Sequence, residues 1–157
     1  MSQARSTLSE ALRLRPNHGG VLLNLATLEH QLKHPTKAEG MYRRAVRAVE
    51  ADVKRCGNCQ PSMTELAKVQ ANYGGLLLQL GRAQEATTVL EAGAPWDAAV
   101  ESARAPGLYH LCLAYRALGR RERATLFCRA SLAAKGTAAV EAMLADLETD
   151  VEVDGLR

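Results

Sequence analysis

One arrangement recurs along this 157-residue chain: a helical stretch, a short turn that often holds glycine, and a second helical stretch in which small and large residues alternate. Full copies cover residues 19–52, 67–100 and 105–136, and a half copy covers residues 2–18. Pro16 cannot continue a helix, so the first helical stretch is expected to end near Arg15. The small and large residues of this pattern lie three or four positions apart within each helical stretch, as one face of a helix requires. They are Leu22, Leu25, Ala26, Ala38, Tyr42 and Ala45, then Tyr73, Leu77, Ala86 and Leu90, then Leu108, Leu111, Cys112, Tyr115, Ala124, Cys128 and Ser131.

The repeated unit resembles the tetratricopeptide repeat, a helix–turn–helix unit of 34 residues in which small side chains let paired helices approach closely. The best matches are residues 19–52, which fill the period without a gap, and the run LAYRALGRRERA at residues 113–124. Glu29 and Leu77 stand where the family often has an aromatic residue, and Glu50 stands where it usually has proline. The resemblance implies an all-α fold: a right-handed α-solenoid of stacked antiparallel helix pairs.

The same pattern divides the chain into a single domain, residues 1–149, and an acidic tail, residues 150–157. About 14 residues more than one period separate the starts of the first two full copies, and they form an insertion at residues 53–66. Residues 137–149 supply one further amphipathic helix, expected to cap the last apolar face of the stack. The chain starts with the second helix of a repeat, so whether it belongs to a longer repeat protein is left open, as is its oligomeric state.

Composition supports helices and limits the function classes. Apolar residues make up 47% of the chain, enough for a core, whereas aromatic residues are only 4%, which favours helices over a sheet. Residues 137–157 carry six acidic groups against Arg157, a net charge of −5, which leaves +8 for residues 1–136. Without interleaved aromatic residues, this mild basicity indicates a solvated helix surface and disfavours nucleic-acid binding.

The chain has no secretory signal and no apolar run near the ~20 residues of a membrane span. A cytoplasmic protein without membrane association is therefore expected. Its four cysteines follow no regular spacing, which predicts reduced thiols, and Cys112 and Cys128 are interpreted as buried core residues.

The resemblance implies that the first helices of the repeats line a concave groove that binds a peptide or protein segment. Asn24 and Asn72 occupy equivalent places in consecutive copies, where the family commonly uses asparagine to hold a ligand's backbone amide. The family's clamp for a terminal carboxylate is matched only in part and is not expected. The candidate groove residues are Asn24, Thr27, His30, Gln31, Lys68, Asn72, Gln79, Tyr109, His110 and Arg116.

The motif CGNC at residues 56–59 lies inside the insertion. Gly57 and Asn58 tolerate positive φ, so the motif is interpreted as the bend of a lengthened helical hairpin. Ser62 and Glu65 have the spacing of a capping box, which predicts that the next helix starts early, near Met63.

Catalytic and metal-binding patterns are weak. The chain has no nucleophile turn, phosphate loop or dinucleotide fingerprint, so it is expected to be no enzyme and to hold no cofactor. His30 and His34 have a zinc-compatible spacing, but a whole helix, roughly 25 Å long, separates His34 from Cys56 and Cys59, so no metal site is expected. The leading hypothesis is a non-enzymatic scaffold for protein–protein interaction. Two alternatives stay open: a thiol redox or metal-responsive adaptor that uses Cys56 and Cys59, and a helical-repeat nucleic-acid binder.

Overall fold

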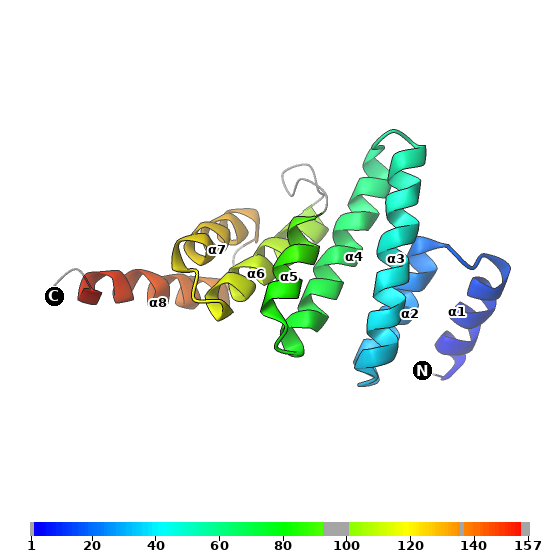
Figure 1. Cartoon of the computed structure of the whole chain (residues 1–157), viewed down its shortest axis with the longest axis horizontal. Helices are drawn as coiled ribbons and strands as arrows, with labels where there is room; N and C mark the ends of the chain where they lie inside the picture. The colour runs from blue at the N-terminus through cyan, green and yellow to red at the C-terminus, as the bar shows by residue number, and fades with distance from the viewer. Residues whose placement is uncertain (1, 93–100, 136, 155–157) are drawn as a thin grey trace.

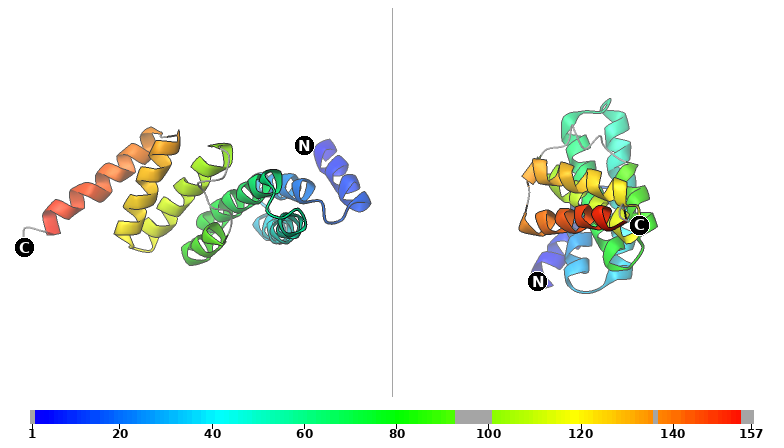
Figure 2. Two further views of the ribbon diagram at one scale, coloured as in Figure 1. Left: turned by 90° about the horizontal axis from the view of Figure 1, so that it is seen from above. Right: turned by 90° about the vertical axis from the view of Figure 1, so that its left-hand side faces the viewer.

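The computed structural model describes residues 2–92, 101–135 and 137–154, and these residues form helices joined by short turns, with no strand. This confirms the all-α prediction. The helices follow one another along the long axis in chain order, and α1 and α8 lie at opposite ends of the molecule (Figures 1 and 2). In order they are α1 (Ser2–Leu14), α2 (Gly19–Gln31), α3 (Pro35–Arg55), α4 (Gln60–Gln79), α5 (Ala83–Glu91), α6 (Glu101–Ala117), α7 (Arg121–Lys135) and α8 (Ala138–Asp154).

Three tight turns close the helix pairs α2–α3, α4–α5 and α6–α7 in the same way. Each turn has one residue with positive φ: Lys33 at 62°, Gly81 at 73° and Gly119 at 68°. In each, the next residue donates its N–H to a carbonyl five positions back: His34 to Glu29, Arg82 to Leu77 and Arg120 to Tyr115. This is the Schellman ending of a helix, which satisfies free carbonyl groups and reverses the chain. The repeated sequence pattern therefore corresponds to a repeated turn.

The residues predicted to be buried form the core. Tyr42, Leu22, Leu77, Leu90 and Leu111 are among the largest fully buried side chains. The small residues of the pattern, which include Ala26, Ala38, Ala86 and Ala124, are 0% exposed. Small side chains at these positions let neighbouring helices pack closely, as the resemblance predicts.

First helices also contact one another along the row, since α4 packs against both α2 and α6. Tyr42 of α3 stacks on Tyr73 of α4, with ring centroids 5.8 Å apart, and joins two successive helix pairs. Glu39 of α3 strengthens the same junction, because its carboxylate binds Arg43 at 2.7 Å and Arg82 at 2.8 Å. The junction between pairs therefore combines aromatic packing with a charged network.

The insertion lengthens α3 and α4, which contain 21 and 20 residues. Their connecting turn has Gly57 at φ 65° and Asn58 at φ 63°, so the predicted bend of a lengthened hairpin is confirmed. The predicted capping box is wrong. Helix α4 already begins at Gln60 with Cys59 as its N-cap, which places Ser62 inside the first turn.

Two boundaries differ at the C-terminal end. Helix α6 begins at Glu101 and includes Pro106 in its interior, although the repeat was predicted to start at residue 105. Helix α8 continues to Asp154, so residues 150–154 of the predicted tail are helical, whereas residues 155–157 lie outside the described residues. The region around residues 93–100 and Gly136 also lies outside the described part.

The prediction of reduced thiols is wrong, because the structure contains two disulfides. Cys112 and Cys128 are buried as predicted, but α6 and α7 bring their Cα atoms within 5.1 Å and the sulfurs are bonded. Cys56 and Cys59 form the second disulfide, across the α3–α4 turn. Sequence spacing did not reveal the first pair, because residues 16 apart meet only when two helices pack side by side.

Candidate peptide-binding groove between α2 and α4

A cavity of about 350 Å³ lies between α2 and α4 and brings two predicted groove residues together. Asn24 lines it from α2 and Lys68 lines it from α4, and both side chains are exposed. We call this cavity the α2/α4 groove. Its lining consists of Gly20, Leu23, Asn24, Pro61, Thr64, Glu65 and Lys68.

The glycine pair at the start of α2 lies close to side chains of α3 and α4. A Cβ on Gly19 would lie 2.3 Å from Val49 Cγ2, and a Cβ on Gly20 would lie 2.7 Å from Glu65 Oε1. Real Cβ atoms do not come this close, so a larger residue at position 19 would force Val49 of α3 or the backbone to shift. At position 20 the flexible Glu65 carboxylate could move aside instead. His18 caps the helix, since its Nδ1 accepts the Val21 N–H at 3.4 Å.

The insertion builds one wall of the groove. Pro61, Thr64 and Glu65 belong to the early turns of α4 that the predicted repeat period does not contain. Sequence reasoning placed Lys68 in the groove but missed these three residues. The signal that could have found them is the predicted early start of α4, because an extended helix opposite α2 must add surface there.

The groove combines several chemistries that suit a polypeptide. Asn24 offers both a donor and an acceptor, which match the two hydrogen-bonding groups of a peptide unit. Lys68 and Glu65 place a cation and an anion on one wall, and Leu23 and Pro61 add apolar surface. Such a lining fits an extended segment with both polar and apolar groups.

Three of the predicted residues tie helices together. His30 Nε2 lies 2.7 Å from Gln79 Oε1, so these two side chains join α2 to α4. Thr27 donates its hydroxyl to Leu23 O at 3.0 Å, and its Oγ1 lies 3.3 Å from the Tyr42 hydroxyl oxygen. A ligand would have to compete with these bonds, which hold α2 against α4 through His30 and against α3 through Thr27.

Asn72 lies one turn beyond Lys68 on α4 and is exposed, but its side-chain amide donates to Lys68 O at 3.0 Å. That bond occupies one amide hydrogen and leaves the acceptor oxygen for a ligand. Gln31 is also exposed, at the last position of α2.

The His110 side chain connects two helices. Its Nδ1 lies 2.8 Å from Ala71 O and must carry the hydrogen, since a carbonyl oxygen only accepts. Burial lowers the pKa of His110 against the opposing effect of this hydrogen bond, so the ring is neutral at physiological pH. A Cβ on Gly75 would lie 2.8 Å from His110 Cε1, so the missing side chain at residue 75 makes room for the ring. The ring ties α6 to α4.

Tyr109 and Arg116 do not line the α2/α4 groove. Tyr109 is half-buried and packs against the main core, and Arg116 faces Asp146 of α8 at 3.6 Å. The structure therefore assembles part of the predicted set into one cavity and distributes the rest along the row of helices.

Glu29 is a buried carboxylate that sequence reasoning identified only as a departure from the family pattern. It is 1% exposed, and its oxygens bind Arg5 of α1 at 2.7 Å and His34 at 2.8 Å. Burial alone would raise the pKa of Glu29, but the hydrogen bond with His34 and the charge of Arg5 hold it below the ordinary value. This carboxylate connects α1, α2 and the α2–α3 turn.

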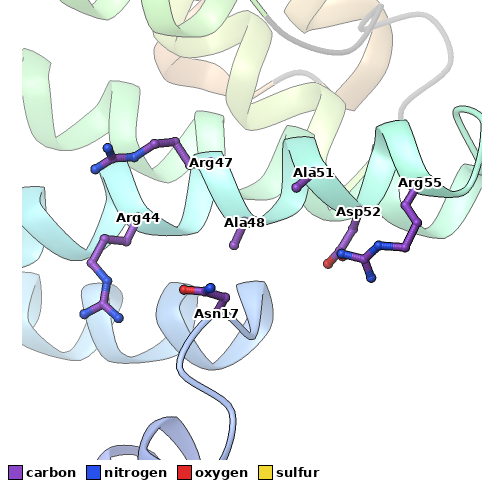
Figure 3. A pocket seen from close by; sticks show the side chains of 7 residues that line it. All are labelled: Asn17, Arg44, Arg47, Ala48, Ala51, Asp52 and Arg55. Atoms are coloured by element: carbon purple, nitrogen blue, oxygen red, sulfur yellow. The ribbon is translucent and has the colours of Figure 1, made fainter.

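A second cavity, of about 340 Å³, lies between α3 and the α1–α2 loop. Arg44, Arg47 and Arg55 surround it, and Figure 3 shows their guanidinium groups spread along α3 rather than converging on one point. Arg44 donates to Pro16 O at 3.0 Å and Arg55 pairs with Asp52 at 2.9 Å. No aromatic side chain lines this cavity, so it lacks the stacking surface that single-stranded nucleic acid uses.

In the described part of the chain, no three His, Cys, Asp or Glu side chains lie close enough together to hold a metal ion. His34 and Cys56 stand at opposite ends of α3, as the N-cap and C-cap residues of that helix. Among the described helices, none combines the length and apolar character needed to cross a bilayer.

No protein family model matches the chain, and no curated protein matches it. The resemblance to tetratricopeptide repeats therefore stays a prediction from the residue pattern.

Proposed function

We propose that this chain is a non-enzymatic scaffold of the tetratricopeptide-like kind, whose helix pairs form a right-handed solenoid and whose α2/α4 groove binds a peptide or protein segment. One observation carries the proposal: Asn24 and Lys68, predicted from separate repeats, line the same cavity. The repeated Schellman turns and the α2–α4 and α4–α6 contacts support the stacked arrangement. A cytoplasmic location belongs to the same proposal.

The bound segment is expected to be extended and to contact the groove through its backbone. Asn24 would bind one peptide unit, and the Asn72 oxygen would accept an N–H further along the segment. Lys68 would pair with a carboxylate of the segment, and Leu23 with Pro61 would cover an apolar side chain. Each hydrogen bond contributes about 0.5–1.5 kcal/mol, so recognition depends on several of them together.

The test is capture of peptides from an array of extended sequences by the purified full chain. Replacing Asn24 and Lys68 by alanine should lower the affinity for the captured peptides by roughly tenfold or more. Each tenfold loss of affinity corresponds to about 1.4 kcal/mol. The matched control replaces Gln84 and Lys135 by alanine, an amide and an amine that are also exposed but lie on α5 and α7. If the groove variant captures the same peptides with unchanged affinity, the α2/α4 groove is not the binding site.

A further inference from the structure

The α3–α4 turn presents a disulfide at the protruding tip of the longest helical hairpin (Figure 1). Cys56 is exposed and Cys59 is half-buried. The second disulfide of the chain differs sharply, because Cys112 and Cys128 are both 0% exposed. Access is a first requirement for exchange with an external thiol, and only the tip disulfide meets it.

The backbone of the turn holds the two sulfurs together without help from the core. Gly57 and Asn58 both have positive φ, at 65° and 63°, which brings the Cα atoms of Cys56 and Cys59 to 5.5 Å. The Cys59 N–H points at Cys56 Sγ, at 3.2 Å. A turn of this kind keeps the two sulfurs adjacent after the bond between them opens.

The surroundings of Cys59 stabilise a thiolate. Cys59 is the N-cap residue of the 20-residue helix α4, and its side chain makes no capping hydrogen bond. The dipole of a helix N-terminus favours negative charge there. Ser62 adds a hydroxyl group, since its Oγ lies 3.3 Å from Cys59 Sγ and 3.7 Å from Cys56 Sγ. Lys54 contributes a further exposed cation two residues before Cys56.

We propose that Cys56–Cys59 is a redox-active disulfide that exchanges with low-molecular-weight thiols. The thiolate of the incoming molecule attacks the exposed Cys56 Sγ, the bond between the two cysteines breaks, and its electron pair leaves on Cys59 Sγ at the start of α4. A second thiolate then attacks the incoming sulfur of the mixed disulfide and releases Cys56. Two thiols are oxidised to one external disulfide, the protein disulfide is reduced, and the two protons pass to the two cysteines.

The experiment incubates the oxidised full chain with reduced glutathione, quenches with iodoacetamide and maps the alkylated and glutathionylated cysteines by mass spectrometry. The pair Cys56 and Cys59 should open at least about tenfold faster than Cys112 and Cys128, which serve as the internal control because their burial denies access. Equal rates for the two pairs, or an unreactive tip pair, would refute the proposal.

The position of the trapped mixed disulfide tests the direction of attack. When reduced glutathione opens the native disulfide, the glutathione should be found on Cys56 and the iodoacetamide label on Cys59, because Cys56 is the more exposed sulfur. Ser62→Ala should slow the opening of the native disulfide severalfold, since the leaving thiolate loses its hydroxyl partner. A Ser62→Ala variant that exchanges at the unchanged rate, or glutathione found equally on Cys56 and Cys59, would contradict the assigned roles.

Discussion

Gly74 occupies a close contact between α4 and α5, and its replacement by alanine tests the helix packing quantitatively. A Cβ at this position would lie 2.7 Å from both Cγ and Cδ2 of Leu90. Carbon atoms in ordinary contact are about 3.5–4.0 Å apart, so one side must move by about 1 Å. Leu90 is 0% exposed and belongs to the main core, so it has no free space into which to turn.

Two opposing effects determine how much Gly74→Ala changes the unfolding free energy. Alanine gains about 1 kcal/mol over glycine in a helix interior. Overpacking a core costs about 1–3 kcal/mol, so Gly74→Ala is expected to lose up to about 2 kcal/mol of unfolding free energy. Gly40→Ala in α3 is the matched control, because a Cβ there meets no atom within 4 Å and gains only the helix-propensity effect.

The assay is urea unfolding of the full chain followed by far-ultraviolet circular dichroism. Gly40→Ala should raise the unfolding free energy and Gly74→Ala should lower it, with a gap of about 1–3 kcal/mol between the variants. Adding Leu90→Ala to the Gly74→Ala variant should cost less than Leu90→Ala alone, since it removes the clashing side chain. If Gly74→Ala stabilises as much as Gly40→Ala, the close packing of α4 on α5 is wrong.

Further predictions concern the buried carboxylate and the buried disulfide. Because the pKa of Glu29 is held below 4.5, its ionised form contributes stability above pH 4.5, and this contribution is lost as the pH falls through the folded-state pKa. Glu29→Gln should therefore lower the unfolding free energy at pH 7 more than at pH 3, and an equal loss at both values would contradict the ion pairs with Arg5 and His34. Replacing Cys112 and Cys128 together by alanine should cost about 3 kcal/mol through loss of the cross-link across their 16-residue separation, measured by urea unfolding without reductant. A change below about 1 kcal/mol would show that the cross-link contributes little.

The sequence predicted the core and the turns well because both follow from local periodicity. Tyr42, Leu90 and Cys128 were expected to be buried from their spacing alone, and all three are 0% exposed. Gly81 and Gly119 ended their helices for the same local reason, since positive φ at a helix end selects glycine.

The side-chain partners were not predictable, because they depend on how helices distant in sequence approach each other. His110 was assigned to the groove from its helical position, yet a carbonyl of α4 binds its ring beside Gly75. Glu29 was recognised as unusual, but its partner Arg5 lies on another helix, 24 residues away in the sequence. The Cys112–Cys128 disulfide was not predicted for the same reason, because these two residues meet only when α6 packs against α7.

The insertion at residues 53–66 gives the two proposed sites a common structural origin and also a way to separate them. Its early α4 residues form one groove wall, and its turn holds the exposed disulfide, with Cys59 only two residues before Pro61. The groove depends on side chains of Asn24 and Lys68, whereas exchange depends on sulfur chemistry at the helix start. The Asn24→Ala/Lys68→Ala variant should therefore lose peptide capture but keep the rate of glutathione exchange. Loss of both properties in that variant would mean that the substitutions disturb α4 itself, and far-ultraviolet circular dichroism would detect that disturbance.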